Sequence, residues 1–511
     1  MHLSKKNNWF FQSNGSLSWL SIWLLFSLVT IGNFILSYPS LASMNFLFFD
    51  TGASLKADYL ISEGYQPAVD FWYPYGLIPL SIGHICYKIF GRTPHTFCAL
   101  VLILKLFSVA VLAKIAIQAN LKFLGIFFLA LTIPFAFSND HLYSLTHVVE
   151  PLLICLAISE HIAGRKRNIL FILIFGWFTK PSMSIVYIFF ILILYFLDLL
   201  TRKSRFSKVL FELLPSGVAF FSLSLIMNHI FSLSSIINTL IPLSGSKIYK
   251  QINAGFFKQG KDFWMPHGAK ITYYLSTLTG FWIILTLLLI VSVTYLYYKK
   301  INRKLDNKAV NQLAEVQLTI LYLHLSFIFF FYGIHSSWGY YSYLLTIGVS
   351  FLASQKFSEL KSLRTALLAI LIVFAIMGYK FSMINNISTW QILKPQESIV
   401  NLWSSQEEKD AFTKLLDSCR TQNTLVYSVG AMDLFFPSCH MPETFYPLTN
   451  IDLSNTEWLR ISKQFDEAQQ VVFVGKFSDI GTIKNIEFKN KFTQFKLDHK
   501  DKLFTYFKRI N

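Results

Sequence analysis

The sequence predicts an α-helical membrane protein with many transmembrane helices and a small α/β domain at its C-terminal end. Hydrophobic residues make up 53% of its 511 residues and charged residues only 14%, which is too apolar for a water-soluble globule. Apolar runs long enough to cross a bilayer recur along the chain. From about residue 385 onward, charged residues are instead spread throughout. We therefore assign residues 1–384 to a transmembrane domain and residues 385–511 to an extracytoplasmic α/β domain.

Charged residues that interrupt the apolar runs delimit the membrane spans. About eleven spans fit this pattern. They lie at residues 17–38, 98–118, 121–138, 147–163, 168–179, 183–200, 208–232, 273–298, 316–333, 338–354 and 364–384. With the N-terminus in the cytoplasm, the Lys and Arg clusters between these runs fall on the cytoplasmic side, as the positive-inside rule requires. With eleven spans, the C-terminal domain then lies outside. We expect the membrane to be the inner membrane of a bacterium.

The excess of basic residues has a simple origin in a membrane protein. The formal net charge is +17, and positive cytoplasmic loops account for such an excess. The sequence contains no nucleic-acid-binding motif, so we do not expect nucleic acid as a partner.

The first outer segment, residues 46–76, is the part of the chain where chemistry is most expected. A long apolar run stops at Asp50, and a polar loop rich in aromatic residues follows. The loop also contains Asp58, Glu63 and Asp70. Carboxylates directly beside a membrane span are costly, and such a placement usually marks function. We expect this loop to form half of an active site.

Two segments need a special placement if the orientation is to hold. Residues 77–91 are apolar but too short to span, so we lay them along the outer surface or as a partial re-entrant helix. The run at 168–200 is broken by Lys180 and Pro181, because proline removes a helix donor and a lysine would otherwise sit inside the bilayer. Two short helices meeting outside at Thr179–Ser182 fit the flanking basic loops.

The C-terminal domain has a mixed helix and strand pattern. Residues 406–419 have a helix-like pattern, and residues 424–430 and 470–475 read as short strands that each end in glycine. Cys419 and Cys439 both lie in this domain. They form either a disulfide, in an oxidising compartment, or two free thiols.

The outer loops together carry the residues that a sugar transfer from a polyprenyl phosphate requires. A carboxylate can act as the base on an acceptor hydroxyl. Lysine and arginine can neutralise the phosphate that leaves. The lipid tail of such a donor would lie against the membrane spans.

Part of the sequence resembles the GT-C superfamily of membrane glycosyltransferases, relatives of protein O-mannosyltransferases and of the lipid A aminoarabinose transferase. Residues 50–76, DTGASLKADYLISEGYQPAVDFWYPYG, followed by an amphipathic segment ending in Phe90–Gly91, resemble the first external loop of that family. HVVEPLL from His147 resembles its second acidic loop, and GWFTKPS around Lys180 resembles its span break with a basic residue. The resemblance covers residues 17–200, and the later spans match only in architecture.

The resemblance implies an inverting transfer from a lipid-phosphate sugar, with Asp50 as the general base. The remaining candidates are Asp70 and Glu150 for catalysis, and Asp58, Tyr73, Tyr75, Arg92, His147, Lys180, Lys270 and His335 for substrate binding. No D-x-D motif occurs in either loop, so a metal is not supported, and we expect no cofactor. The expected partners are a polyprenyl-phosphate-linked hexose or pentose, a glycan, lipid or protein acceptor, and membrane lipid.

Most of these residues also have a structural interpretation. Asp50 could simply reach water at a helix end, and Asp70 could be a turn or cap residue. Glu150 would suit the dipole at a helix start, and Lys180 could snorkel to the interface. The others could belong to an interfacial aromatic belt or to a solvated or lipid-headgroup-binding loop: Tyr73, Tyr75, His335 and the lysines of residues 247–270.

Two other functional classes stay open. A transporter or flippase of lipid-linked saccharides would need a similar membrane body, but the chain shows no paired halves or matched interrupted spans of the kind that inverted repeats leave. A ligase of lipid-linked saccharides, similar to O-antigen ligases, or an acyl-transferring membrane protein would rest on His and Arg chemistry in a late loop, so full activity after loss of Asp50 would indicate this class.

The predicted orientation can be tested by cysteine labelling. Single cysteines introduced at residues 255 and 400 are expected to react with a membrane-impermeant thiol reagent in spheroplasts, and one at residue 303 is not, because only the first two lie outside. Labelling at 303 alone would invert the orientation and move the proposed site to the cytoplasmic face.

Overall fold

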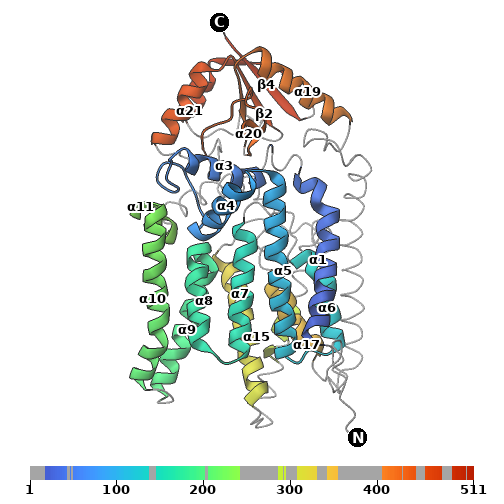
Figure 1. Cartoon of the computed structure of the whole chain (residues 1–511), viewed down its shortest axis with the longest axis vertical. Helices are drawn as coiled ribbons and strands as arrows, with labels where there is room; N and C mark the ends of the chain where they lie inside the picture. Colours follow the sequence, from blue (N-terminus) through green and yellow to red (C-terminus); the bar gives the residue numbers. More distant parts are fainter. Residues whose placement is uncertain are drawn as a thin grey trace, which may run out of the picture.

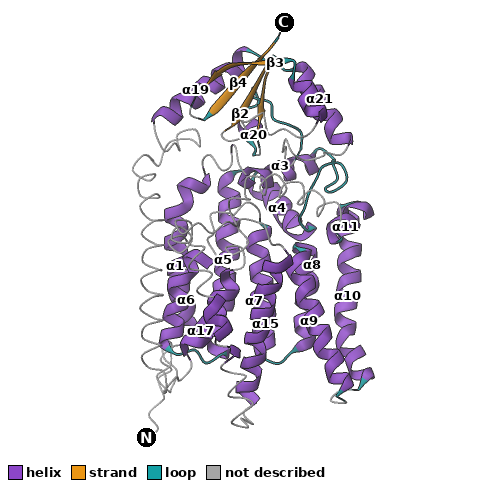
Figure 2. Ribbon diagram, turned by 180° about the vertical axis from the view of Figure 1, so that it is seen from behind, coloured by secondary structure: helices purple, strands orange, loops and turns teal. Residues whose placement is uncertain are grey.

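The computed structural model describes residues 18–42, 47, 50–136, 145–201, 205–241, 286–291, 293–294, 308–330, 342–354, 406–428, 430–444, 455–474, 486–501 and 503–510. An elongated bundle of helices makes up most of the molecule, and a small sheet with its own helices caps one end (Figure 1). The view from behind shows the same two layers (Figure 2).

Apolar helices form the bundle. They are α1 (Trp19–Ala42), α5 (Pro94–Gln118), α6 (Phe123–Ala136), α7 (Thr146–Ile162), α8 (Lys166–Thr179), α9 (Pro181–Leu200), α10 (Phe206–Ile230), α15 (Lys308–Phe330) and α17 (Ser342–Ser354), with the short α11 (Leu233–Leu240) after α10. Among the described helices, α5, α9 and α10 are long and apolar enough to cross a membrane. Large apolar side chains of α10, such as Phe221 and Leu225, are exposed, as lipid-facing residues are. The protein is thus a polytopic membrane protein.

The helices agree with most of the predicted spans. For example, α9 begins two residues before the predicted span at 183–200 and ends with it. The predicted span at 273–298 is helical where the structure describes it, at residues 286–291 and 293–294. The predicted span at 364–384 and the domain boundary at 385 lie outside the described residues, so the total of eleven spans stays a prediction.

Helices α8 and α9 form an antiparallel hairpin, as the break at Lys180 and Pro181 predicts. Lys180 has an extended backbone, with φ −158° and ψ 109°, and Pro181 occupies the first turn of α9. A Cβ atom built on Gly176 would lie 2.3 Å from the Ser184 hydroxyl oxygen, so the two helices pass very closely beside the turn. Lys166 and Asp198, 2.7 Å apart, pair at the far end of the hairpin.

The first outer segment differs from the predicted loop, because it contains helix α3 (Asp50–Ser62). The run TGASLKADYLIS contains Ala, Leu and Lys, which favour helix, and Gly64, at φ 91°, follows the end of the helix. Helix α1 ends at Ala42 and Asp50 is the first residue of α3, so Asp50 does not end the helix of the first predicted span. The polar loop is therefore confined to residues 63–76.

Helix α4 (Leu77–Phe90) is the amphipathic surface helix expected at residues 77–91. Leu80 and Tyr87 are buried against the rest of the protein, whereas Ile85, Ile89 and Phe90 are exposed. Helices α3 and α4 lie between the bundle and the sheet (Figures 1 and 2). This arrangement brings the first outer segment into contact with both layers.

The C-terminal part forms a mixed four-stranded sheet. Its elements are α19 (Gln406–Thr421), β1 (Thr424–Tyr427), α20 (Met432–Phe435), α21 (Asn455–Glu467), β2 (Gln470–Val474), α22 (Ile486–Phe492), β3 (Phe495–Lys500) and β4 (Phe504–Arg509). The strand order is β1-β2-β4-β3, and only β1 and β2 are parallel. The expected helix at 406–419 and both expected strands are present.

Alternate strand residues bury the two faces of the sheet against different helices. Val426, Val472 and Tyr506 pack with α19, whereas Tyr427 and Phe473 pack with α21 and α22.

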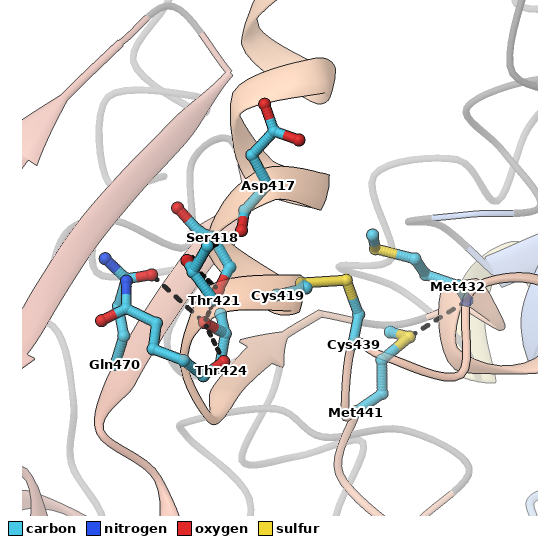
Figure 3. The surroundings of a disulfide bond; sticks show 10 residues. Asp417, Ser418, Cys419, Thr421, Thr424, Met432, Cys439, Met441 and Gln470 are labelled. Atoms are coloured by element: carbon cyan, nitrogen blue, oxygen red, sulfur yellow. Dashed lines mark hydrogen bonds between the residues drawn. A yellow bond between two sulfur atoms is a disulfide. The ribbon is translucent and has the colours of Figure 1, made fainter.

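A disulfide settles the question that the sequence left open for the two C-terminal cysteines. Cys419, at the end of α19, is bonded to Cys439, and Figure 3 shows this bond beside the sulfur of Met441, which accepts the backbone N–H of Met432 at 3.1 Å. The segment after α20 is thereby joined both to α19 and to α20 itself.

Candidate functional site

Three parts of the chain meet at the end of the bundle that faces the sheet. They are the end of the loop after α3, the first turn of α7, and the break between α8 and α9. The backbone N–H of Gly76 donates to the carbonyl oxygen of Thr179 at 2.9 Å. A Cβ atom on Gly76 would lie 2.0 Å from the carbonyl oxygen of Phe178, so any other residue would push the loop away from the break.

Glu150 and Lys180 form an ion pair at this meeting point. Lys180 Nζ lies 3.3 Å from Glu150 Oε2. The Glu150 side chain is 3% exposed and that of Lys180 is 17% exposed, so the glutamate is covered while part of the lysine side chain is accessible to solvent. A buried carboxylate requires such a partner, because an unpaired charge in a low-dielectric interior is strongly destabilising. The two residues that the sequence singled out separately thus form one unit.

Three aromatic rings connect this pair to the first loop. His147, on the same turn of α7 as Glu150, contacts Tyr75 edge to face at a centroid distance of 5.6 Å. Tyr75 contacts Tyr73 in the same way at 5.7 Å. Burial raises the pKa of the Tyr73 phenol above its usual range, so its hydroxyl group stays protonated and able to donate. The structure therefore brings three of the predicted substrate-binding residues together.

Asp70 has the contacts of a turn residue. Its carboxylate oxygen Oδ2 accepts the backbone N–H of Gln66 at 2.7 Å. Its own N–H donates to the carbonyl oxygen of Gln66 at 2.8 Å, which closes a tight turn. Ala68, inside this turn, has φ 58°, in the left-handed region that alanine rarely adopts. These contacts match the structural interpretation of Asp70 given by the sequence.

Asp58 and Arg92, both predicted to bind substrate, contact each other instead of lying separately in the loop. Asp58 is 1% exposed. Its two oxygens contact Nδ1 of His84 at 2.7 Å and Nε of Arg92 at 2.5 Å. Arg92 also donates to the Ser62 hydroxyl and lies 5.6 Å from the centre of the Tyr59 ring. This group joins α3 to α4 and to the segment that precedes α5.

Sequence reasoning missed the contacts between the first outer segment and the C-terminal part. Lys56, which is 1% exposed, pairs with Asp433 of α20. The backbone N–H of Trp72 donates to Glu457 of α21 at 2.9 Å. Both contacts join residues more than 370 positions apart. No periodicity or spacing in the sequence links such residues.

A cavity of about 540 Å³ lies between α8 and α10, on the membrane side of the same break. Phe171 and Phe175 of α8 line one wall, and the other wall comes from α10. The α10 residues are Leu214, Pro215, Val218, Ala219, Ser222, Leu223 and Ile226. Phe175 is five residues before Lys180, which corresponds to about 7 Å along a helix.

Three predicted site residues are not placed by the structure at the level of their side chains. The backbone of Asp50 begins α3, but its side chain is outside the described part of the chain. Lys270 and His335 lie outside the described residues altogether.

No protein-family model matches this sequence, and no curated protein matches it significantly. Among solved structures, the chain is similar to a crystal structure of ArnT from Cupriavidus metallidurans bound to undecaprenyl phosphate. The two share 11% sequence identity with a TM-score of 0.45, and the match covers 95% of this chain and 97% of that chain.

Proposed function

We propose that this protein is an integral-membrane glycosyltransferase of the inner membrane of a bacterium. It transfers a hexose or pentose from a polyprenyl-phosphate donor, with inversion, to a glycan, lipid or protein acceptor. The observation that carries the proposal is the position of the Glu150–Lys180 pair at the helix break that ends α8, the helix that also lines an apolar cavity. A cationic group beside an apolar cavity suits a ligand with an anionic head and a long apolar tail.

The phosphate of the donor is assigned to Lys180 and the start of α9. The first N–H groups of a helix have no partner within the helix, and the helix dipole favours an anion there. Lysine has three N–H donors, so its ammonium group can contact Glu150 and still donate to a phosphate oxygen. In this proposal Glu150 orients Lys180.

The lipid tail of the donor is assigned to the cavity between α8 and α10. Eight of its nine lining residues are apolar, the exception being Ser222. An isoprenoid tail reaches this cavity from the bilayer, which is equally apolar, so van der Waals packing against the lining side chains is what favours its binding there. Because Phe175 and Lys180 lie on the same helix end, the head and the tail of one molecule can occupy both places together.

The transfer step requires a base, which we assign to Asp50. The acceptor hydroxyl oxygen forms a bond to the anomeric carbon while the bond from that carbon to the phosphate oxygen breaks. The polyprenyl phosphate leaves with the bonding electron pair, beside Lys180, and the acceptor proton passes to the Asp50 carboxylate. Tyr73, Tyr75 and His147 are assigned to the sugar, because aromatic rings and a protonated phenol suit a polyhydroxylated ring.

Asp50→Asn tests the base. Asparagine keeps the size of the side chain but cannot accept the proton, so turnover is expected to fall by about 10²–10⁴-fold. Donor binding and protein yield should stay close to wild type. The measurement is sugar transfer by purified protein with a lipid-linked donor, and Asp70→Asn is the comparison, expected to lower yield by loosening the turn. Normal transfer by Asp50→Asn would show that another group is the base.

Lys180→Ala tests the phosphate contact. Loss of a charge-assisted hydrogen bond costs roughly 1.5–3 kcal/mol, so the donor Kd is expected to rise by about 10- to 150-fold. Glu150→Gln is the matched variant, because its amide oxygen can still accept from Lys180 and so keep the ammonium group in place, and its donor affinity should be retained. Equal donor affinity in wild type and in Lys180→Ala would show that Lys180 pairs with Glu150 and does not contact the donor phosphate.

Val218→Trp tests the cavity. The larger side chain fills space that the isoprenoid tail would occupy, so the KM for a long-chain donor is expected to rise about tenfold, while the KM for a donor with two isoprene units changes little. Phe221→Trp on the same helix is the control, because Phe221 does not line the cavity. A chain-length-independent effect of Val218→Trp would argue against a tail in this cavity.

A further inference from the structure

The C-terminal sheet contacts the candidate site through two residues on one face of α21. Glu457 and Arg460 are three positions apart, so their side chains project from neighbouring turns of the same helix face. Both reach residues of the first loop. The loop thus has a second support, formed by a part of the chain nearly 400 residues later.

Glu457 is a buried acceptor for the loop backbone. It is 1% exposed, and its Oε1 accepts both the Trp72 N–H at 2.9 Å and the Thr444 hydroxyl at 2.6 Å. A carboxylate at this depth is stable only because such donors surround it. Removing the acceptor would leave the Trp72 N–H without this partner.

Arg460 holds the turn that precedes Trp72. Its guanidinium donates to the carbonyl oxygen of Asp70 at 2.6 Å and lies 4.4 Å from the centre of the Tyr65 ring. Between these two contacts lies Ala68, with its left-handed backbone. A rarely adopted backbone conformation persists only where several contacts from the surrounding structure hold it in place. Arg460 supplies two of the contacts that do so.

A third contact joins the first outer segment to the C-terminal part. Lys56 of α3 pairs with Asp433 of α20, and α20 is held in place by the Cys439 disulfide and by the sulfur of Met441 (Figure 3). The C-terminal part therefore contacts the first outer segment at two places, on helix α3 and on the loop that follows it. Together these contacts hold the segment in one position.

We propose that Glu457 and Arg460 are positioning residues, which set the loop so that Tyr73 and Tyr75 face the donor sugar. Trp72 is followed directly by Tyr73, and Tyr75 contacts His147, so a shift of the Trp72 backbone moves the rings that are assigned to the sugar. This inference rests on the proposed function. It makes the C-terminal sheet part of the active-site scaffold rather than a separately acting module.

Three variants at Glu457 and Arg460, with one control, test the positioning role. Glu457→Ala and Arg460→Ala each remove a loop contact, whereas Glu457→Gln keeps an oxygen acceptor for the Trp72 N–H. Lys463→Ala, at a side chain that is 78% exposed on the same helix, is the control. We expect roughly 10- to 100-fold lower kcat for the two alanine variants, because small misplacements of substrate-positioning groups are costly. The Kd for polyprenyl phosphate, which lacks the sugar, should be unchanged, since Lys180 and the cavity are untouched, and Glu457→Gln should recover most of the activity.

Hydrogen–deuterium exchange of the full-length protein supplies a readout that does not depend on activity. Faster exchange is expected in peptides covering residues 65–76 of Glu457→Ala, with unchanged exchange in β2 and β4, which rules out loss of the sheet. Unchanged exchange at 65–76, or a kcat equal to wild type, would overturn the positioning role. Absence of sugar transfer by the wild-type protein would instead overturn the proposed function itself.

Discussion

The helix break at Lys180 and Pro181 is the constraint on which the rest of the site depends. A lysine at the end of a membrane helix hairpin needs either water or a counter-charge. Glu150 provides that charge from α7. The break also leaves the Thr179 carbonyl without a helical partner, and the Gly76 N–H fills this place, which brings the first outer segment onto α8. One interruption in one span thus brings three distant parts of the chain together.

The sequence was informative wherever a single local pattern decided the structure. Apolar runs located the bundle helices, and proline after lysine located the turn between α8 and α9. Two short β-like runs ending in glycine located β1 and β2. These signals work because membrane burial and helix termination act on neighbouring residues. Glu150 and Lys180 were found for the same reason, since a charged residue in an apolar stretch is itself a local signal.

Contacts made between distant elements could not be predicted in this way. Lys56 was expected to be one polar residue of a loop, yet α3 buries it against Asp433. Asp58 and Arg92 were both expected to reach substrate, and nothing in their spacing shows that the fold pairs them directly and adds His84 as a second partner of Asp58. Such pairs follow from how helices pack, and packing depends on tertiary contacts that a single sequence does not display.

The contacts of the carboxylates also bear on which acid can accept a proton. Both oxygens of Asp58 already contact cationic or imidazole groups, and Asp70 is engaged in the turn with Gln66. Glu150 is covered and paired with Lys180. A general base must reach the substrate hydroxyl with an available oxygen, and an acid that also holds the fold together meets this requirement poorly. Among the acids that the sequence nominated for catalysis, Asp70 and Glu150 are thus engaged in structural contacts, which is why the proposed function assigns the base to Asp50, at the start of α3.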